Sequence, residues 1–97
     1  MTTYSLEFLP SALKEWKRLG GNVREQFRKK LAARLGNPHV ASAKLRELPD
    51  CYKIKLRAAG YRLVYRVEDD KLIVTVITVG RRDRNLVYKI AMGRVEA

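Results

Sequence analysis

The stretch CYKIKLRAAGYRLVYRV, residues 51–67, decides the fold. In its first part the apolar positions 52, 54 and 56 alternate with the basic residues Lys53, Lys55 and Arg57. The segment 58–60 (Ala-Ala-Gly) is a turn signal, and the alternation resumes beyond it at Tyr61. Successive side chains of a strand point to opposite faces. Two alternating runs joined by a turn therefore predict an antiparallel hairpin with one apolar and one basic face.

The register of this hairpin follows from the same alternation. The apolar faces match only when Ile54 lies opposite Leu63, because a slip by one residue would bury the charges. That register places Lys55 opposite Arg62, with Lys53 and Arg57 next along the strand. Like charges directly across a ladder are destabilising, so we predict that this face binds an anion. Taken alone, the face favours general phosphate binding over catalysis.

The sequence after the hairpin extends the sheet. Residues 72–79 form a β-branched run typical of a central strand that is covered on both faces. Gly80 ends this run, so the arginines that follow leave the sheet at the rim of the basic face; they are Arg81, Arg82 and Arg84. Asn85 is predicted to cap a short last helix that ends at Met92. Tyr88 then lies about one turn beyond the rim, within reach of the basic face.

The sequence before the hairpin predicts a strand and two helices. Tyr4, Leu6 and Phe8 alternate with polar residues as in a half-buried strand. A first helix is expected to begin at Pro10 and to end before 20–21 (Gly-Gly); its apolar residues are Leu13, Trp16 and Leu19. Asn22 and Glu25 resemble a capping box for a second helix that ends at 36–38 (Gly-Asn-Pro); its apolar stripe is Val23, Phe27, Leu31 and Leu35. The predicted fold class is α+β, with a helical hairpin packed on a small antiparallel sheet and a C-terminal helix.

Size and charge limit the classes of function. The 97 residues fit a single domain, 1–97, and a hydrophobic fraction of 46% is enough for a folded core. Lys and Arg total 21 against 10 acids, a net charge of +11. This charge predicts a polyanionic partner, with nucleic acid first, while an acidic protein or an anionic membrane surface remains open. No apolar run approaches the roughly 20 residues of a membrane span, no signal peptide is recognisable, and Cys51 is the only cysteine. The cytoplasm is therefore the default expectation.

The basic face is compatible with RNA cleavage by the neighbouring 2′-hydroxyl. That reaction needs a base, a stabiliser of charge on the phosphate, and an acid for the leaving oxygen. The only histidine, His39, lies outside the cluster, and the acids lack the close set that a two-metal site needs, so we expect no metal or cofactor. A lysine becomes a base only if its pKa falls by about three, or about 4 kcal/mol. Lys55 is best placed for this, because neighbouring cations disfavour its charged form.

Several spaced motifs of this chain resemble the RelE toxins. The segments that carry the resemblance are 13–16 (LKEW), 23–26 (VREQ), 48–57 (LPDCYKIKLR), 60–65 (GYRLVY), 79–82 (VGRR) and 87–88 (VY). The resemblance implies a RelE-like fold of the microbial ribonuclease type, and the toxin half of a type II toxin–antitoxin pair. It implies cleavage of messenger RNA in the ribosomal A site. It also implies neutralisation by a RelB-type antitoxin, and binding of operator DNA only as the toxin–antitoxin complex that represses its own operon.

The resemblance also assigns residues. The family's functional positions fall on Lys53, Lys55, Arg62, Arg82 and Tyr88. Lys55 is then a candidate base, Arg82 a phosphate stabiliser and possible acid, and Tyr88 an orienting or proton-transfer group. Further phosphate contacts are expected from Arg46, Arg57, Arg81 and Arg84. The second helix presents either a solvated face or a ribosomal RNA contact through Arg24, Arg28, Lys29 and Lys30.

Two other functions stay open. The chain could be a basic module that binds RNA, ribosomes or DNA without cutting, or a toxin of similar fold that blocks another target such as gyrase. The joint presence of Lys55, Arg82 and Tyr88 favours the nuclease, because a binding module has no need of that trio.

Overall fold

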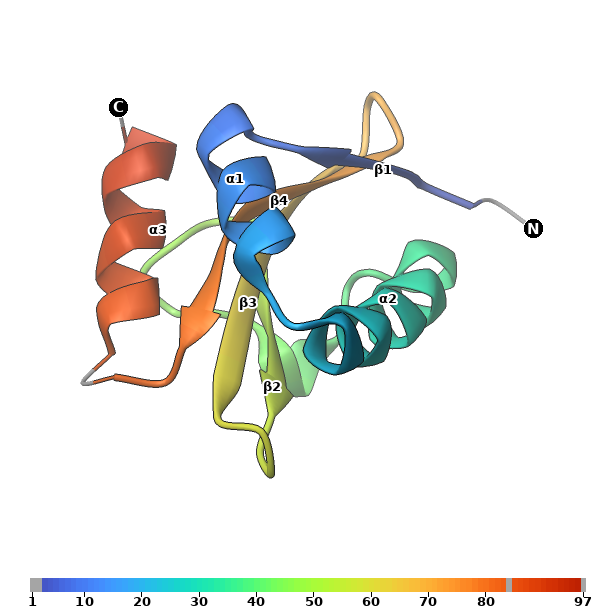
Figure 1. The fold of residues 1–97 in the computed structure, drawn as a ribbon. Coiled ribbons are helices and arrows are strands. Elements are labelled where there is room, and N and C mark those ends of the chain that lie inside the picture. Colours follow the sequence, from blue (N-terminus) through green and yellow to red (C-terminus); the bar gives the residue numbers. More distant parts are fainter. Residues whose placement is uncertain (1–2, 84, 97) are drawn as a thin grey trace.

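The computed structural model describes residues 3–83 and 85–96 and contains the elements that the sequence predicts, in the predicted order. The strands are β1 (Ser5–Phe8), β2 (Cys51–Leu56), β3 (Tyr61–Glu68) and β4 (Ile73–Arg81). The helices are α1 (Pro10–Arg18), α2 (Gly21–Gly36) and α3 (Leu86–Glu96), with a short 3₁₀ turn at Ala41–Ala43. This arrangement confirms the α+β class (Figure 1).

The sheet has the strand order β1-β4-β3-β2. Strands β2, β3 and β4 form the predicted antiparallel meander, in which Ile54 pairs with Leu63 and Lys55 pairs with Arg62. The register deduced from the alternation is therefore confirmed. Strand β1 joins the far side of β4 in parallel, so the complete sheet is mixed. A β-bulge lies beside Val64 and Tyr65, whose partners on β4 are Thr78 and Val76.

Helices cover both faces of the sheet. On one face α1 packs against β4 and α2 packs against β2, with Trp16 and Phe27 in contact at the centre of the larger core. On the other face α3 packs against β3 and β4, where Val87 and Ala91 meet Ile77 in a smaller core. The residues of β4 from Val74 to Val79 are buried, which confirms that the central strand is covered on both sides.

The predicted caps of α2 and α3 and the predicted end of α3 are wrong. Helix α2 begins at Gly21 without a side-chain cap, and Asn22 lies inside its first turn, where it accepts a hydrogen bond from Gln26. Leu13 is exposed, because α1 turns Ala12 and Trp16 toward the sheet. Helix α3 continues past Met92 to Glu96, since packing against the sheet stabilises helix that local signals do not predict.

Asn85 precedes α3 in a left-handed conformation, with φ 63°, and not in the extended conformation of an N-cap residue. Asparagine adopts this region more readily than most residues. Its backbone carbonyl accepts hydrogen bonds from the N–H groups of Tyr88 and Lys89, so the first turn of α3 is held by the main chain.

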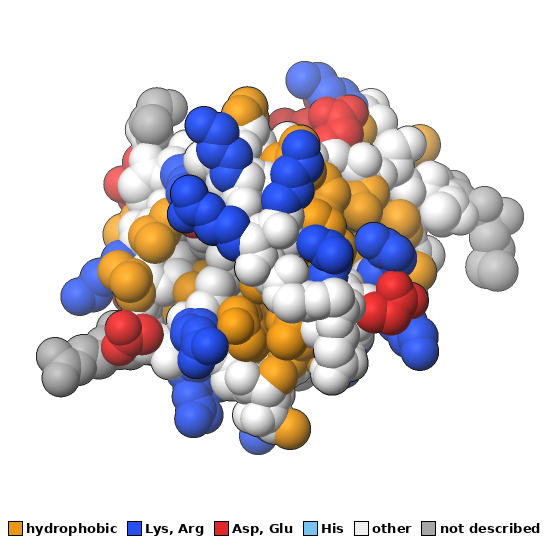
Figure 2. Space-filling view, in the orientation of Figure 1, with side chains coloured by type: hydrophobic (Ala, Val, Ile, Leu, Met, Phe, Trp, Pro, Cys, Tyr) orange, Lys and Arg blue, Asp and Glu red, His pale blue; other side chains and the backbone are white. Residues whose placement is uncertain are grey.

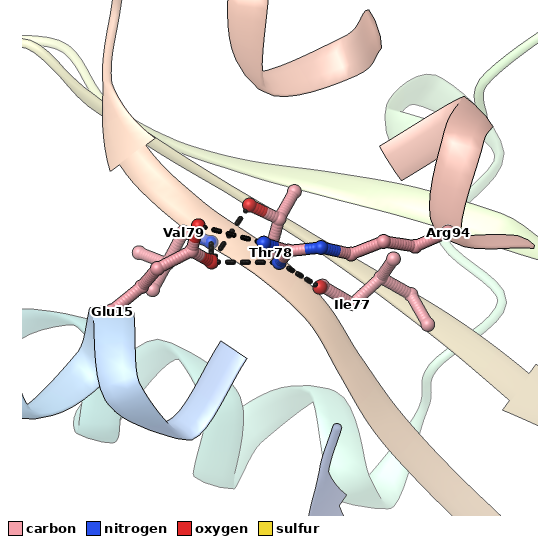
Figure 3. A network of polar contacts seen from close by, with 5 residues as sticks. All are labelled: Glu15, Ile77, Thr78, Val79 and Arg94. Carbon is pink, nitrogen blue, oxygen red and sulfur yellow. Dashed lines mark hydrogen bonds and ion pairs between the residues drawn. The ribbon is translucent and has the colours of Figure 1, made fainter. Parts of the chain in front are cut away.

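A polar network joins α1, β4 and α3 (Figure 3). Strand β1 pairs with β4 only from Ile73 to Val76, so the next residues of β4 lie beyond the end of β1. There the carboxylate of Glu15 accepts hydrogen bonds from the Thr78 hydroxyl (2.9 Å) and the Val79 N–H (3.3 Å). Arg94 donates to Glu15 (2.8 and 3.1 Å) and to the Ile77 carbonyl (2.8 Å). Side chains thus cover this stretch of strand edge.

Candidate active site

A cationic cleft of about 220 Å³ opens beside the start of α3. The residues that the sequence singled out as catalytic all line it: Lys53, Lys55, Arg62, Arg82 and Tyr88. They come from β2, β3, the segment after β4, and α3. The fold therefore brings together residues that span positions 53 to 88 of the sequence.

The strand pairing explains how the sheet residues reach the cleft. Lys53 and Lys55 are two residues apart on β2 and so point to the same face, and Arg62 lies directly opposite Lys55. Gly80 lies opposite Arg62 on β4 and has no side chain above the sheet. A Cβ at Gly80 would lie 3.6 Å from the Val87 side chain, so α3 starts in close contact with the sheet. This approach brings Tyr88 to the cleft.

A backbone hydrogen bond ties the loop after β4 to a neighbouring turn. The N–H of Arg82 donates to the carbonyl of Gly60 at 2.7 Å, which ties this loop to the turn between β2 and β3. Gly60 adopts φ 74°, a conformation that glycine takes without steric cost. The arginine loop and the lysine strand are therefore fixed relative to each other at one end of the sheet.

The cleft carries an excess of positive charge. Arg62 is only 7% exposed, and its guanidinium donates to the carbonyl of Tyr61 at 2.9 Å. The ion pairs within residues 3–83 and 85–96 include none of the cleft lysines or arginines. The pKa of Lys55 is lowered. The largest cause is the charge of Lys53, followed by desolvation and by the charges of Arg62 and Arg57. The lowering of the Lys55 pKa and the cations that cause it are those expected from the sequence.

Three of the residues predicted to bind phosphate, Arg46, Arg57 and Arg81, do not line the cleft. Arg57 is exposed at the end of β2, and the Arg81 guanidinium lies over the ring of Tyr61, 5.5 Å from its centroid. Arg46 lines a neighbouring pocket. Arg84 lies outside the described residues. The cleft lining therefore includes Arg82 but not Arg57 or Arg81.

The basic residues of α2 lie elsewhere, because α2 covers the face of the sheet opposite α3. Arg24 donates to the carbonyls of Lys17 and Leu19, Arg28 pairs with Glu25, and Lys29 and Lys30 are exposed. Figure 2 shows Lys and Arg side chains spread over much of the viewed face. The four residues are thus not part of the cleft.

Sequence reasoning missed part of the lining. Asp83, Asn85 and Val87 also line the cleft, and their positions between Arg82 and Tyr88 were the available signal. A second pocket of about 420 Å³ adjoins the cleft and shares Lys53, Asn85 and Tyr88 with it. Most of its other lining comes from Leu45, Arg46, Glu47 and Leu48. This segment has no sequence period that would have revealed a pocket.

His39 and Cys51 do not line the cleft. His39 bonds to the Tyr52 hydroxyl (2.8 Å) and to Asp69 (2.7 Å), and it does not line the cleft, as predicted. Burial raises the pKa of the Cys51 thiol to about 11. Within the described part of the chain, no three His, Cys, Asp or Glu side chains gather as a metal site would need.

None of the helices described is long and apolar enough to cross a membrane.

Comparison with known proteins places the chain in a family. Residues 6–86 match the ParE toxin family of type II toxin–antitoxin systems, parDE. The chain is 55% identical to the mRNA interferase toxin RelE of Escherichia coli K12, over 95% of this chain and 97% of that protein. A mutant of the E. coli toxin RelE in the free state superposes with a TM-score of 0.89 at 53% identity, covering 96% of this chain and 98% of the other.

One chain of a known toxin–antitoxin complex is also similar to this protein. The intact E. coli RelBE complex contains a chain that superposes with a TM-score of 0.81 at 57% identity, covering 84% of this chain and 99% of that one. The matching motifs, the shared fold and the near-complete coverage agree. The chain therefore belongs to the ParE-type toxins of type II toxin–antitoxin systems and, within them, to the RelE toxins.

Proposed function

We propose that this protein is an endoribonuclease toxin that cuts messenger RNA in the ribosomal A site and so stops translation. The observation that carries the proposal is the meeting of Lys53, Lys55, Arg62, Arg82 and Tyr88 in one cleft. The name of the E. coli relative, an mRNA interferase toxin, supports the same activity. The net charge of +11 suits work on a polyanion such as messenger and ribosomal RNA.

The cleft supplies a base and charge-stabilising groups for attack by the 2′-hydroxyl. Lys55, whose pKa is lowered, takes the proton of the 2′-hydroxyl, and the oxygen attacks the adjacent phosphorus. Arg62 and Arg82 stabilise the negative charge that grows on the phosphate oxygens. Tyr88 positions the nucleotide that carries the attacking hydroxyl. The bond between phosphorus and the 5′-oxygen breaks, the departing oxygen takes a proton from water, and a 2′,3′-cyclic phosphate is left.

The proposed reaction is metal-independent. The cleft is lined by lysine and arginine, and Asp83 is its one carboxylate within the described residues. Divalent cations need several oxygen ligands, and a concentration of positive charge repels them. Arginine and lysine take over the charge stabilisation that a metal ion supplies in other nucleases.

The proposed partner is a RelB-type antitoxin, since the E. coli relative is known in complex with RelB. An antitoxin would neutralise the toxin, and the pair would repress its own operon by binding operator DNA as a complex. A toxin that acts on ribosomes works in the cytoplasm.

The test is primer extension on a messenger programmed into purified 70S ribosomes. Wild type is compared with Arg82→Ala and with Lys71→Ala, which removes an exposed charge in the turn before β4. We expect an A-site cut for wild type and Lys71→Ala, and none for Arg82→Ala. On free RNA, added chelator should leave the slow wild-type cleavage unchanged. Ribosome binding without any cut would instead favour a non-catalytic basic module.

A further inference from the structure

We propose that the pocket beside the cleft is a nucleobase subsite and that Glu47 sets which base it prefers. This inference rests on the proposed function, because the base belongs to the RNA whose phosphate occupies the cleft. It concerns a partly different set of residues, contributed mainly by the segment before β2 and by α3.

The floor of the pocket suits the flat face of a base. Leu48 is buried in the smaller core, and Leu45, Tyr88 and Met92 are partly buried against that core while they line the pocket. An aromatic ring beside aliphatic and thioether side chains gives a surface on which any base can stack. The volume of about 420 Å³ leaves room for a whole base.

The pocket is continuous with the cleft. Tyr88, Lys53 and Asn85 line both, so a nucleotide with its phosphate in the cleft can place its base across Tyr88 in the pocket. Arg46 and Lys89 add positive charge around the pocket. A neighbouring phosphate would be attracted there, and this argues for RNA as the occupant.

Glu47 and Asn85 bring hydrogen-bond acceptors to a pocket whose other charged side chains are cationic. Glu47 and Asn85 are exposed residues that line the pocket. A carboxylate accepts from exocyclic amino groups, as in recognition of the cytosine N4 amine. Cytosine, adenine and guanine carry such a group and uracil does not. We therefore expect a base with an amino group to be preferred over uracil.

The experiment uses ribosomes programmed with messengers that differ only in one nucleotide next to the cut. The nucleotide is varied on the 5′ side in one set of messengers and on the 3′ side in another. The readout is the ratio of cleavage rates with cytosine and with uracil for wild type, Glu47→Ala and Glu47→Gln. Asp70→Asn, a carboxylate removed from the exposed turn before β4, is the matched control. We expect Glu47→Ala to lower the ratio at least about five-fold, the lower limit for a specific base contact. Glu47→Gln should retain part of the preference, and the control should retain all of it.

A binding measurement separates failure of this inference from failure of the proposed function. The methyl resonance of Met92 is followed by NMR while wild-type protein is titrated with cytidine 3′-monophosphate or with ribose 5-phosphate. We expect a saturable shift with the nucleotide only. Equal shifts with both compounds, or none, would overturn the subsite whether or not RNA is cut. An unchanged base ratio in Glu47→Ala, with weakened antitoxin binding, would reassign the pocket to a protein partner.

Discussion

Replacing Glu15 by alanine should cost about 3 kcal/mol of stability. The Glu15 carboxylate accepts hydrogen bonds from Arg94, from the Thr78 hydroxyl and from the Val79 N–H (Figure 3). A hydrogen bond to a charged group contributes about 1.5–3 kcal/mol, and a neutral donor left without a partner costs about 1–3 kcal/mol. The Glu15 and Arg94 side chains are each 24% exposed, so water replaces part of the loss and the low end of each range applies.

Thermal melting at neutral pH measures this effect. For a domain of this size about 1 kcal/mol corresponds to roughly 4–5 °C, so Tm should fall by roughly 12–15 °C. Glu25→Ala is the matched control, because Glu25 pairs with Arg28 at the surface, where both side chains are more than half exposed. That change should cost less than about 0.5 kcal/mol. Glu15→Gln should fall between the two, since an amide oxygen still accepts from Val79.

The pH dependence adds an independent check. Burial by itself would raise the pKa of Glu15, but hydrogen bonds from Arg94, Thr78 and Val79 outweigh it and lower the pKa below 4.5. The stabilisation is therefore complete above pH 4.5 and is lost as pH falls through the lowered pKa of the folded state. The difference in Tm between wild type and Glu15→Ala should shrink under those acidic conditions. Equal Tm values for Glu15→Ala and Glu25→Ala at neutral pH would refute the reasoning.

Further predictions concern the cleft and the partner. Lys55→Ala and Arg82→Ala should abolish growth arrest on expression while circular dichroism shows an intact fold; arrest by either variant would remove the role assigned to that residue. Lys53→Met should move the rising limb of the pH–rate profile to higher pH, because the charge of Lys53 is the largest cause of the lowered pKa of Lys55; an unmoved limb would argue against Lys55 as the base. Purified protein should cut free RNA far more slowly than ribosome-bound messenger, since the cleft alone lacks a well-placed acid, and brisk cleavage of naked RNA would contradict this. Binding of an acidic antitoxin should weaken as salt rises, measured by calorimetry at two ionic strengths, and a salt-independent affinity would mean a mainly apolar interface.

The meander was predictable from local pattern. Because strand side chains alternate between faces, the positions of Ile54 and Leu63 fixed the register, and the register then fixed the pairing of Lys55 with Arg62. The prediction that β4 ends at Gly80 was wrong by one residue, because Arg81 still pairs with Tyr61 and the chain leaves the sheet only at Arg82. The candidate site could therefore be assembled from the sequence, with the resemblance to RelE toxins adding the expected roles of its residues.

Contacts between distant segments were not predictable in this way. The parallel pairing of β1 with β4, the start of α2 at Gly21 and the extension of α3 to Glu96 depend on what each element packs against. Glu15 and Arg94 are 79 positions apart and meet only because α1 and α3 flank the same stretch of β4. The second pocket forms because the segment before β2 is tied to Cys51 by the Leu45 N–H and faces α3. Periodicity and turn chemistry act over a few residues, so they can be recognised in the sequence alone. The placement of a helix on a sheet is the outcome of burial summed over the whole chain, so only the tertiary structure decides it.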